Sequence, residues 1–233
     1  ISDLRNMDVA LGGQGAPIVP LGEKLLFADY DYWLNLGGIC NISFQENGTW
    51  KAFDIGACNQ VLDALALEVA MEYDEGGKIA ASGKVNTELL SVLNELEYFR
   101  KSPPKSLDNS FSEKKILPII YRFDIPLPDK LRTAVEHIAV QIDACVAPAE
   151  IPQKLLATGG GALNTFLIER LSALLQEKKV AVIVPDMQTV QYKEALIMAL
   201  LGALRWMGKA TVMSSVTGGT GESVGGAVWV GKG

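Results

Sequence analysis

The sequence is poor in the features that mark secreted, membrane and nucleic-acid-binding proteins. It holds three cysteines with no CxxC pair, and no apolar run long enough to cross a membrane. Few and unpaired cysteines are typical of reduced thiols, not of a disulfide framework or a zinc site. The net charge of −6 argues against a nucleic-acid-binding surface, which needs a basic patch. We therefore expect a cytoplasmic protein without membrane or nucleic-acid partners.

Several signals of common folds and sites are missing as well. The sequence has no GxxxxGK[ST] phosphate loop and no GxGxxG after a strand, which disfavours Walker-type and dinucleotide-binding folds. No internal repeat occurs, so solenoids and propellers are disfavoured. His137 is the only histidine, and its place beside Ile138 on an expected helix favours a structural role over a catalytic one.

What the chain does have is enough apolar residues for a sizeable core. Hydrophobic residues make up 48% of the 233 positions and charged residues 21%, a composition typical of ordered globular domains. The first part predicts three antiparallel strands, over 33–36, 39–44 and 50–53. A Gly-Gly pair and an Asn-Gly pair separate these strands, and both are hairpin signals.

Helical spacing of apolar residues follows the strands. It predicts a helix over 60–73 and further helices within a helical insertion at about 74–150. Pro103-Pro104 is a stiff extended break in this insertion. Asp129 is expected to be the N-cap of its longest helix.

An alternation of strand and helix then returns. The expected elements are a strand over 154–157, a helix capped by Asn164, a parallel buried strand over 180–184, a final helix over 192–207 stopped by Gly208, and one short strand over 227–230. This order predicts a ribonuclease-H-like α/β fold. Its mixed sheet has three antiparallel strands and then two parallel ones, with flanking helices and the helical insertion.

Three glycine turns stand at expected strand ends: Gly37-Gly38, Gly56 and Gly159-Gly160-Gly161. Glycine lets a backbone approach a phosphate closely, and the exposed N–H groups of such turns form an anion cradle. A single Gly-Gly pair is more often a plain hairpin turn. Three turns on one edge of a sheet favour a phosphate-binding site.

Asp54 is the most informative carboxylate, because it follows an expected strand and precedes a helix. Ligands of open α/β sheets bind at that edge. An ionised aspartate there can accept a proton from water or hold Mg²⁺. It can equally cap the helix that starts near Asn59, or pair with a lysine.

Glu194 is expected in the first turn of the final helix. Its commonest role there is to complement the helix dipole. Residue type and position alone do not decide between this role and a ligand contact.

Motifs along the chain resemble, in order, those of one known family, the anhydro-N-acetylmuramic acid kinases. The most specific is GGQGAPIVP at 12–20, which is similar to the family signature GGQGAPLVP. The other matching stretches are SDLRNMDVA (2–10), NLGGICNI (35–42), FDIGACN (53–59), PPKS (103–106), GGGALN (159–164), KEA (193–195) and VTG (216–218). The resemblance covers essentially the whole chain.

The resemblance implies a member of the actin-like ATPase and sugar kinase superfamily. Such kinases open the 1,6-anhydro bridge of anhydro-N-acetylmuramic acid with water and phosphorylate O6 with ATP and Mg²⁺, in peptidoglycan recycling. By resemblance, Asp54 is the general base that activates the water, and Gln14 and Glu194 contact the anhydrosugar. The implied nucleotide-binding residues are Gly37, Gly38, Asn41, Gly159, Gly160, Gly161 and Asn164. No metal ligand is assigned, and a homodimer is one expected assembly.

The chain departs from the family pattern in three places. The family's GPGN is Gly56-Ala57-Cys58-Asn59 here, and its TGRE after PPKS is LDNS at 107–110. The second departure bears on the substrate or on the subunit contact made there. The family's N-terminal GLMSGTSxDG phosphate loop does not occur. We therefore expect residues 1–233 to be the C-terminal lobe, incomplete for catalysis alone. A non-catalytic nucleotide-binding or structural relative of the same fold stays an open alternative.

Overall fold

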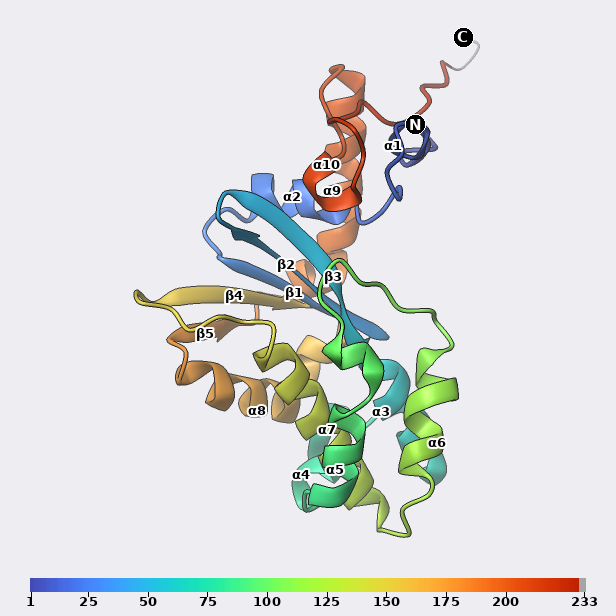
Figure 1. Ribbon diagram of the computed structural model, residues 1–233, viewed down its shortest axis with the longest axis vertical. Helices are drawn as coiled ribbons and strands as arrows, with labels where there is room; N and C mark the ends of the chain where they lie inside the picture. The colour runs from blue at the N-terminus through green and yellow to red at the C-terminus, as the bar shows by residue number, and fades with distance from the viewer. Residues whose placement is uncertain (231–233) are drawn as a thin grey trace.

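The computed structural model describes residues 1–230 and has a five-stranded mixed sheet with helices on both faces (Figure 1). The strand order is β3-β2-β1-β4-β5. The strands are β1 Tyr32–Leu36, β2 Ile39–Glu46, β3 Thr49–Ala57, β4 Gln153–Thr158 and β5 Val180–Ile183. The first three pair antiparallel, and β4 pairs parallel with both β1 and β5. The predicted sheet, three antiparallel and then two parallel strands, is confirmed.

The helices divide between the two faces of this sheet. Those of the described part are α1 Asn6–Ala10, α2 Val19–Leu26, α3 Asn59–Ala66, α4 Lys78–Ser82, α5 Thr87–Asn94, α6 Leu117–Ile120, α7 Leu127–Asp143, α8 Thr165–Gln176, α9 Met187–Trp206 and α10 Ser214–Thr217. Helices α3 to α8 lie on one face, whereas α1, α2, α9 and α10 lie on the other (Figure 1). Helices α4 to α7 fall within the region predicted as an insertion.

The alternation of side chains along β1 explains why both faces are covered. Leu34 pairs in register with Ile42 of β2, and both are buried in the main core beneath α3, α7 and α8. Trp33 points to the opposite face, where it packs with Trp50 in a smaller cluster, their ring centroids 4.8 Å apart. A strand that is apolar on both faces must be covered on both.

Strand β3 is longer than predicted, and its length moves Asp54. The strand continues to Ala57, pairing with β2 past a bulge between Cys40 and Asn41. Asp54 therefore lies inside the strand, opposite Asn41, and not at its end. Gly56 is likewise a strand residue opposite Cys40, so its prediction as a turn is wrong.

The helix predicted over 60–73 is too long. Helix α3 ends at Ala66, followed by one 3₁₀ turn. Ala70 takes a φ of +57°, and the N–H of Met71 donates to the carbonyl of Ala66 (3.2 Å). This is the Schellman pattern that stops helices. The apolar spacing of the sequence continues beyond that stop and gives no sign of it.

Helix α7 begins two residues before Asp129, so the prediction of Asp129 as N-cap is wrong. Pro126 is the N-cap, and Pro128 stands in the first turn, where it loses no helical hydrogen bond. The carboxylate of Asp129 instead accepts the backbone N–H of Lys84 (2.7 Å), which ties α7 to the loop after α4.

Helix α9 also begins earlier than predicted. Asp186 is its N-cap and accepts the N–H of Thr189 (3.0 Å). Glu194 is consequently about two turns inside the helix, beyond the reach of the helix dipole, which fades after the first turn. The predicted stop is confirmed, because Gly208 has a φ of +69° just after the helix.

The remaining predictions have mixed outcomes. Asn164 caps α8 as predicted, accepting the N–H of Leu167 (3.0 Å). The strand at 180–184 is parallel as predicted but is not fully buried, because β5 is an edge strand and Ala181 is exposed. No strand forms over 227–230, where the described backbone has only an isolated bridge between Ala227 and Ser2.

Candidate active site

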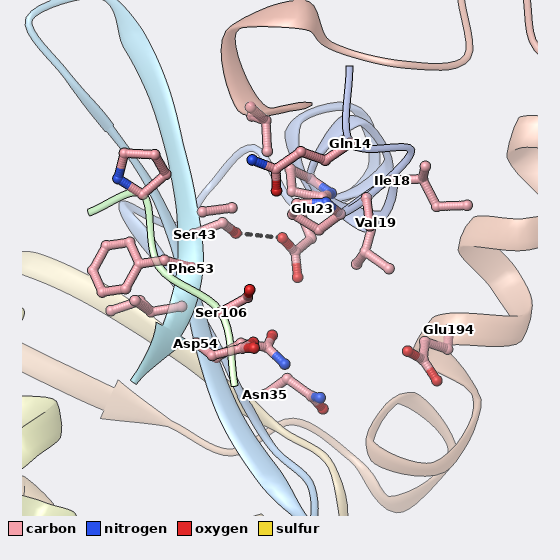
Figure 2. Close-up of a pocket in the computed structure, with 18 of the residues that line it drawn as sticks. Gln14, Ile18, Val19, Glu23, Asn35, Ser43, Phe53, Asp54, Ser106 and Glu194 are labelled. Atoms are coloured by element: carbon pink, nitrogen blue, oxygen red, sulfur yellow. Dashed lines mark hydrogen bonds between the residues drawn. The ribbon is translucent and has the colours of Figure 1, made fainter. Parts of the chain in front are cut away.

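A cavity of about 520 Å³ opens between the sheet and the helices α2 and α9. Figure 2 shows the side chains that converge on it from separate elements, among them Glu23 from α2, Asp54 from β3 and Glu194 from α9. The polar or charged lining residues are Arg5, Gln14, Glu23, Asn35, Asn41, Ser43, Asp54, Lys105, Ser106, Lys193 and Glu194. Segments far apart in sequence therefore build one site.

A second cavity of about 190 Å³ adjoins the first. Asn35, Lys193 and Glu194 line both cavities. Gly159 and Gly160 line only the second. The shared residues join the two cavities into one site with a carboxylate-containing part and a glycine-bordered part.

Asp54 is held by its backbone and by one carboxylate oxygen. Its N–H donates to the carbonyl of Lys105 (3.2 Å), and its carbonyl accepts the hydroxyl of Tyr98 (2.6 Å). Its Oδ2 accepts the backbone N–H of Leu107 (2.9 Å). Among residues 1–230 no group is hydrogen-bonded to Oδ1, which leaves this oxygen available to a ligand. Figure 2 shows the side chain pointing into the cavity.

The surroundings of Asp54 make it a better base. Burial raises the pKa of this carboxyl, and the hydrogen bond from Leu107 offsets part of the rise. A carboxylate with a raised pKa holds an abstracted proton more firmly. The two structural roles left open by the sequence are absent within residues 1–230, because Asp54 neither caps α3 nor pairs with a lysine.

A buried ion pair forms part of the cavity wall. The ammonium of Lys193 lies 2.7 Å from Oε1 of Glu23, and both side chains are about 5% exposed or less. Oε2 of Glu23 accepts the hydroxyl of Ser43. The pair thereby joins α2, β2 and α9, the elements that form the cavity wall.

Gln14 lies on a loop that is held in place by hydrogen bonds to the buried side chain of Asp8. The carboxylate of Asp8 is fully buried and accepts the N–H of Gly15 (2.8 Å) and the hydroxyl of Thr217 (2.7 Å). The N–H of Gln14 donates to the carbonyl of Thr217 (2.9 Å). A Cβ at Gly13 would lie 2.2 Å from Asp8 Oδ2, so only glycine fits there.

The structure brings four of the predicted site residues to the first cavity: Gln14, Asn41, Asp54 and Glu194. Glu194 is exposed to it, unlike the neighbouring Lys193. These four residues come from a loop, two adjacent strands and a helix.

The predicted glycines meet at one edge of the sheet but play different parts. Gly159 has a φ of +82°, and a Cβ on it would lie 2.8 Å from the carbonyl oxygen of Leu36, at the end of the neighbouring β1. Gly161 packs equally tightly on Leu36. Gly37 and Gly38 lie outside both cavities, and their carbonyls accept N–H groups from the start of α3.

Asn164 also lies outside both cavities, and its side-chain oxygen is used in capping α8. Its role as a nucleotide contact stays a prediction. The same holds for Gly37, Gly38 and Gly161, which line neither cavity.

Sequence reasoning missed several residues of the site: Arg5, Glu23, Asn35, Ser43 and Lys193. The ion pair was not foreseeable from local pattern, because Glu23 and Lys193 are 170 positions apart. One usable signal existed for Lys193, which directly precedes Glu194 in the KEA motif.

Two classes of feature are absent from the described residues 1–230. No group of three or more His, Cys, Asp or Glu side chains is placed to hold a metal ion there. No helix of this region is both long and apolar enough to cross a membrane.

The fold and the site define an α/β domain with two adjoining cavities on one face and at one edge of a mixed sheet. The family model described as anhydro-N-acetylmuramic acid kinase matches residues 1–231. The chain belongs to this family.

Curated relatives agree with the family model. The chain is 38% identical over 226 residues to the anhydro-N-acetylmuramic acid kinase of Vibrio cholerae, a match over 94% of this chain and 61% of the relative. It is 30% identical over 217 residues to that of Bacillus cereus, over 86% of this chain and 57% of the relative. The chain thus spans about three fifths of the length of the curated relatives it matches.

Similarity to solved structures is weaker. The activator of 2-hydroxyisocaproyl-CoA dehydratase from Clostridium difficile aligns with 77% of this chain and 62% of its own, at 17% identity and a TM-score of 0.47. These values are too low to carry a conclusion about this chain.

Proposed function

We propose that the protein carrying this chain is an ATP-dependent kinase of anhydro-N-acetylmuramic acid. It hydrolyses the 1,6-anhydro bridge and phosphorylates the sugar at O6, in peptidoglycan recycling in the cytoplasm. The single observation that carries this proposal is Asp54, a half-buried carboxylate with one oxygen directed at the cavity and available to a ligand. Family membership supplies the reaction that such a base would serve.

Asp54 acts as the general base. Its Oδ1 accepts a proton from water as the water oxygen bonds to the anomeric carbon, and the bond from that carbon to O6 breaks. O6 then takes the γ-phosphoryl group of ATP, and ADP leaves. Hydrogen bonds to the carbonyl of Lys105, from the N–H of Leu107 and from the hydroxyl of Tyr98 keep the carboxylate facing the cavity. Positioning of this kind supplies much of the rate in phosphoryl transfer.

The sugar is proposed to occupy the larger cavity, beside Gln14 and Glu194. ATP is proposed to lie along the glycine-bordered edge. Its phosphates would point toward Gly37-Gly38 and its adenosine toward Gly159–161 and Asn164. Asn41, which pairs with Asp54 across the two strands, is also proposed to contact the nucleotide. The adjoining cavity supports the part of this placement that involves Gly159 and Gly160, which line it. Asn35 and Lys193 line both cavities and stand where the two ligands would meet.

Mg²⁺ is proposed to enter with ATP. This ion is usually held by substrate phosphates, waters and only one or two carboxylates. The ion would neutralise phosphate charge. We also propose that the protein forms a homodimer.

The test is the substitution Asp54→Asn in the protein encoded by the complete gene. Asparagine keeps the size and an acceptor for the Leu107 N–H but cannot take a proton at neutral pH. We expect the rate of product formation, measured by mass spectrometry, to fall about a hundred- to ten-thousandfold. ATP affinity should persist.

Two results would contradict this assignment. Near-normal turnover in Asp54→Asn would reject Asp54 as the base. If the wild-type protein binds ATP but never phosphorylates an anhydrosugar, it is instead a non-catalytic nucleotide-binding relative.

A further inference from the structure

We propose that Arg5 selects the acidic form of the sugar by binding its carboxylate. This inference rests on the proposed function, because it concerns the substrate of the same site. The observations behind it are the charges that line the larger cavity and the partners that each of them has.

The cavity holds more negative than available positive charge. Three carboxylates line it: those of Glu23, Asp54 and Glu194. Glu23 is neutralised by Lys193. Asp54 and Glu194 have no ion-pair partner within residues 1–230. A sugar acid is itself an anion at neutral pH, so this cavity would repel it unless a cation receives its carboxylate.

Two of the three cationic side chains that line the cavity are already engaged. Lys193 is 4% exposed and is hydrogen-bonded to Glu23 at 2.7 Å. The ammonium of Lys105 lies 4.8 Å from the ring centroid of Tyr98 and 5.9 Å from that of Phe53, and both rings are buried. Phe53 belongs to the main core on the other face of the sheet. Lys105 is therefore directed away from a ligand on the cavity side.

Arg5 is the remaining cation, and its guanidinium is not engaged. In the described part of the chain it takes part in no ion pair and no side-chain hydrogen bond, and the residue is exposed. Five N–H donors are thus available at the cavity wall.

The Cβ of Arg5 is held by packing, although its guanidinium makes no hydrogen bond or ion pair within the described residues. An ideal Cβ on Gly15 would lie 3.3 Å from Cβ of Arg5, so the loop that carries Gln14 packs against the start of this side chain. The same loop is fastened by the buried carboxylate of Asp8. A cation on a fixed stem loses less freedom when it binds a ligand.

The chemistry of the group favours a carboxylate as its ligand. The guanidinium fork matches the two oxygens of a carboxylate in a bidentate pair. Phosphate oxygens would suit it too, but Arg5 lines only the larger cavity and not the glycine-bordered one. Its place beside Gln14 assigns it to the sugar.

The experiment compares two substrates in the protein encoded by the complete gene: anhydro-N-acetylmuramic acid and the same sugar with its acid converted to the primary amide. We expect Arg5→Met to raise KM for the acid about ten- to hundredfold, the size of a lost charge-assisted pair. KM for the amide and kcat for both substrates should change little. Arg5→Lys should fall between, because it keeps the charge but loses the fork.

Arg122→Met is the matched control. Arg122 is also exposed and unpaired among the described residues, but it lines neither cavity, so both KM values should stay as in the wild type. An unchanged KM for the acid in Arg5→Met would overturn the inference. So would an equal loss with acid and amide, which would place Arg5 on the phosphate or on the sugar ring.

Failure of the proposed function gives a different result. If the wild-type protein turns over neither sugar, the kinase proposal falls. Equilibrium affinities of wild type and Arg5→Met for the acid and the amide then decide the inference by themselves. Selective weakening of acid binding would support it, and parallel affinities would reject it.

Discussion

Lys193 and Glu194 are neighbours in sequence, yet the fold gives them opposite environments. Successive residues of a helix point about 100° apart, so one side chain can enter the protein while the next faces a cavity. Lys193 is 4% exposed and paired with Glu23, whereas Glu194 is exposed to the site. The buried pair fixes the turn of α9 that carries Glu194.

The buried pair should couple strongly when one partner is removed. Lys193→Met leaves the carboxylate of Glu23 buried without its cation, which costs about 3–5 kcal/mol of unfolding free energy. The double variant Glu23→Gln with Lys193→Met removes both charges and should recover most of that loss. Urea unfolding of the two single variants and the double variant measures the coupling.

The surface pair of Lys51 and Glu46 is the control. Their side chains are 40% and 50% exposed, so Lys51→Met should cost less than about 1 kcal/mol. If Lys193→Met costs as little as Lys51→Met, Glu23 must be satisfied by solvent, and the pair does not organise the cavity wall.

At the scale of elements, the cavity depends on how closely α2 approaches α9. Gly22 of α2 is buried against Ile197 of α9, which is itself fully buried. An added Cβ at Gly22 would lie 2.4 Å from Cγ2 of Ile197 and 3.0 Å from its Cβ. The glycine is needed for this close packing. Because Glu23 follows it directly, the contact also sets the distance between Glu23 of α2 and Lys193 of α9.

Gly22→Ala should therefore destabilise the protein by about 1–3 kcal/mol, the cost typical of overpacking a core. Gly202→Ala is the matched change within α9, where the nearest atom to the new methyl group is 3.8 Å away. Alanine there should stabilise by up to about 1 kcal/mol, since glycine weakens helices. Thermal unfolding of both variants provides the comparison, and equal effects would reject the packing explanation.

The elements also show how far sequence reasoning reaches. The strand directions of the sheet were predictable, because hairpin turns and the alternation of strand and helix are local signals. The end of α3 was not, because a left-handed Ala70 stops a helix whose apolar spacing continues. Asp129 has the residue type of an N-cap, but a bond to Lys84 from another segment uses its carboxylate. Tertiary contacts of this kind leave no trace in a window of neighbouring residues.

The site divides in the same way. Family motifs supplied the roles of Gln14, Asp54 and Glu194, and the fold brings these three residues to one cavity. Arg5 and Glu23 were not named, because their importance lies in the charges they face. Charge balance within a cavity emerges only once distant segments are assembled.

For the whole molecule, the buried histidine links stability to pH. His137 is 4% exposed, its Nδ1 lies 2.7 Å from Oδ1 of Asn94, and the ring of Phe99 packs edge-on at 4.8 Å. The amide oxygen also accepts from Gln141, so Nδ1 carries the ring proton. Burial lowers the pKa of His137 to about 3. The neutral ring therefore joins α5 to α7 within the helical region.

The sign of the effect follows from the two pKa values. The unfolded chain binds a proton at His137 below a pH of about 6.5, whereas the folded protein does so only near pH 3. The stability that depends on the neutral ring is complete above pH 6.5 and is lost as the pH falls toward 3. The slope reaches about 1.4 kcal/mol per pH unit. Because this is the only histidine, nothing else of its type titrates in that window.

Substitution of His137 by Asn isolates this contribution. Asparagine can place an N–H near the position of Nδ1, so His137→Asn should be less stable than the wild type at pH 7, where the packed ring is lost. Between pH 6.5 and 4 the wild type should lose stability more steeply than the variant, and the two curves should converge. Urea unfolding at several pH values measures both slopes. Parallel curves would mean that the imidazole is already solvated in the folded protein, and the helical region would then not be held together by a neutral histidine.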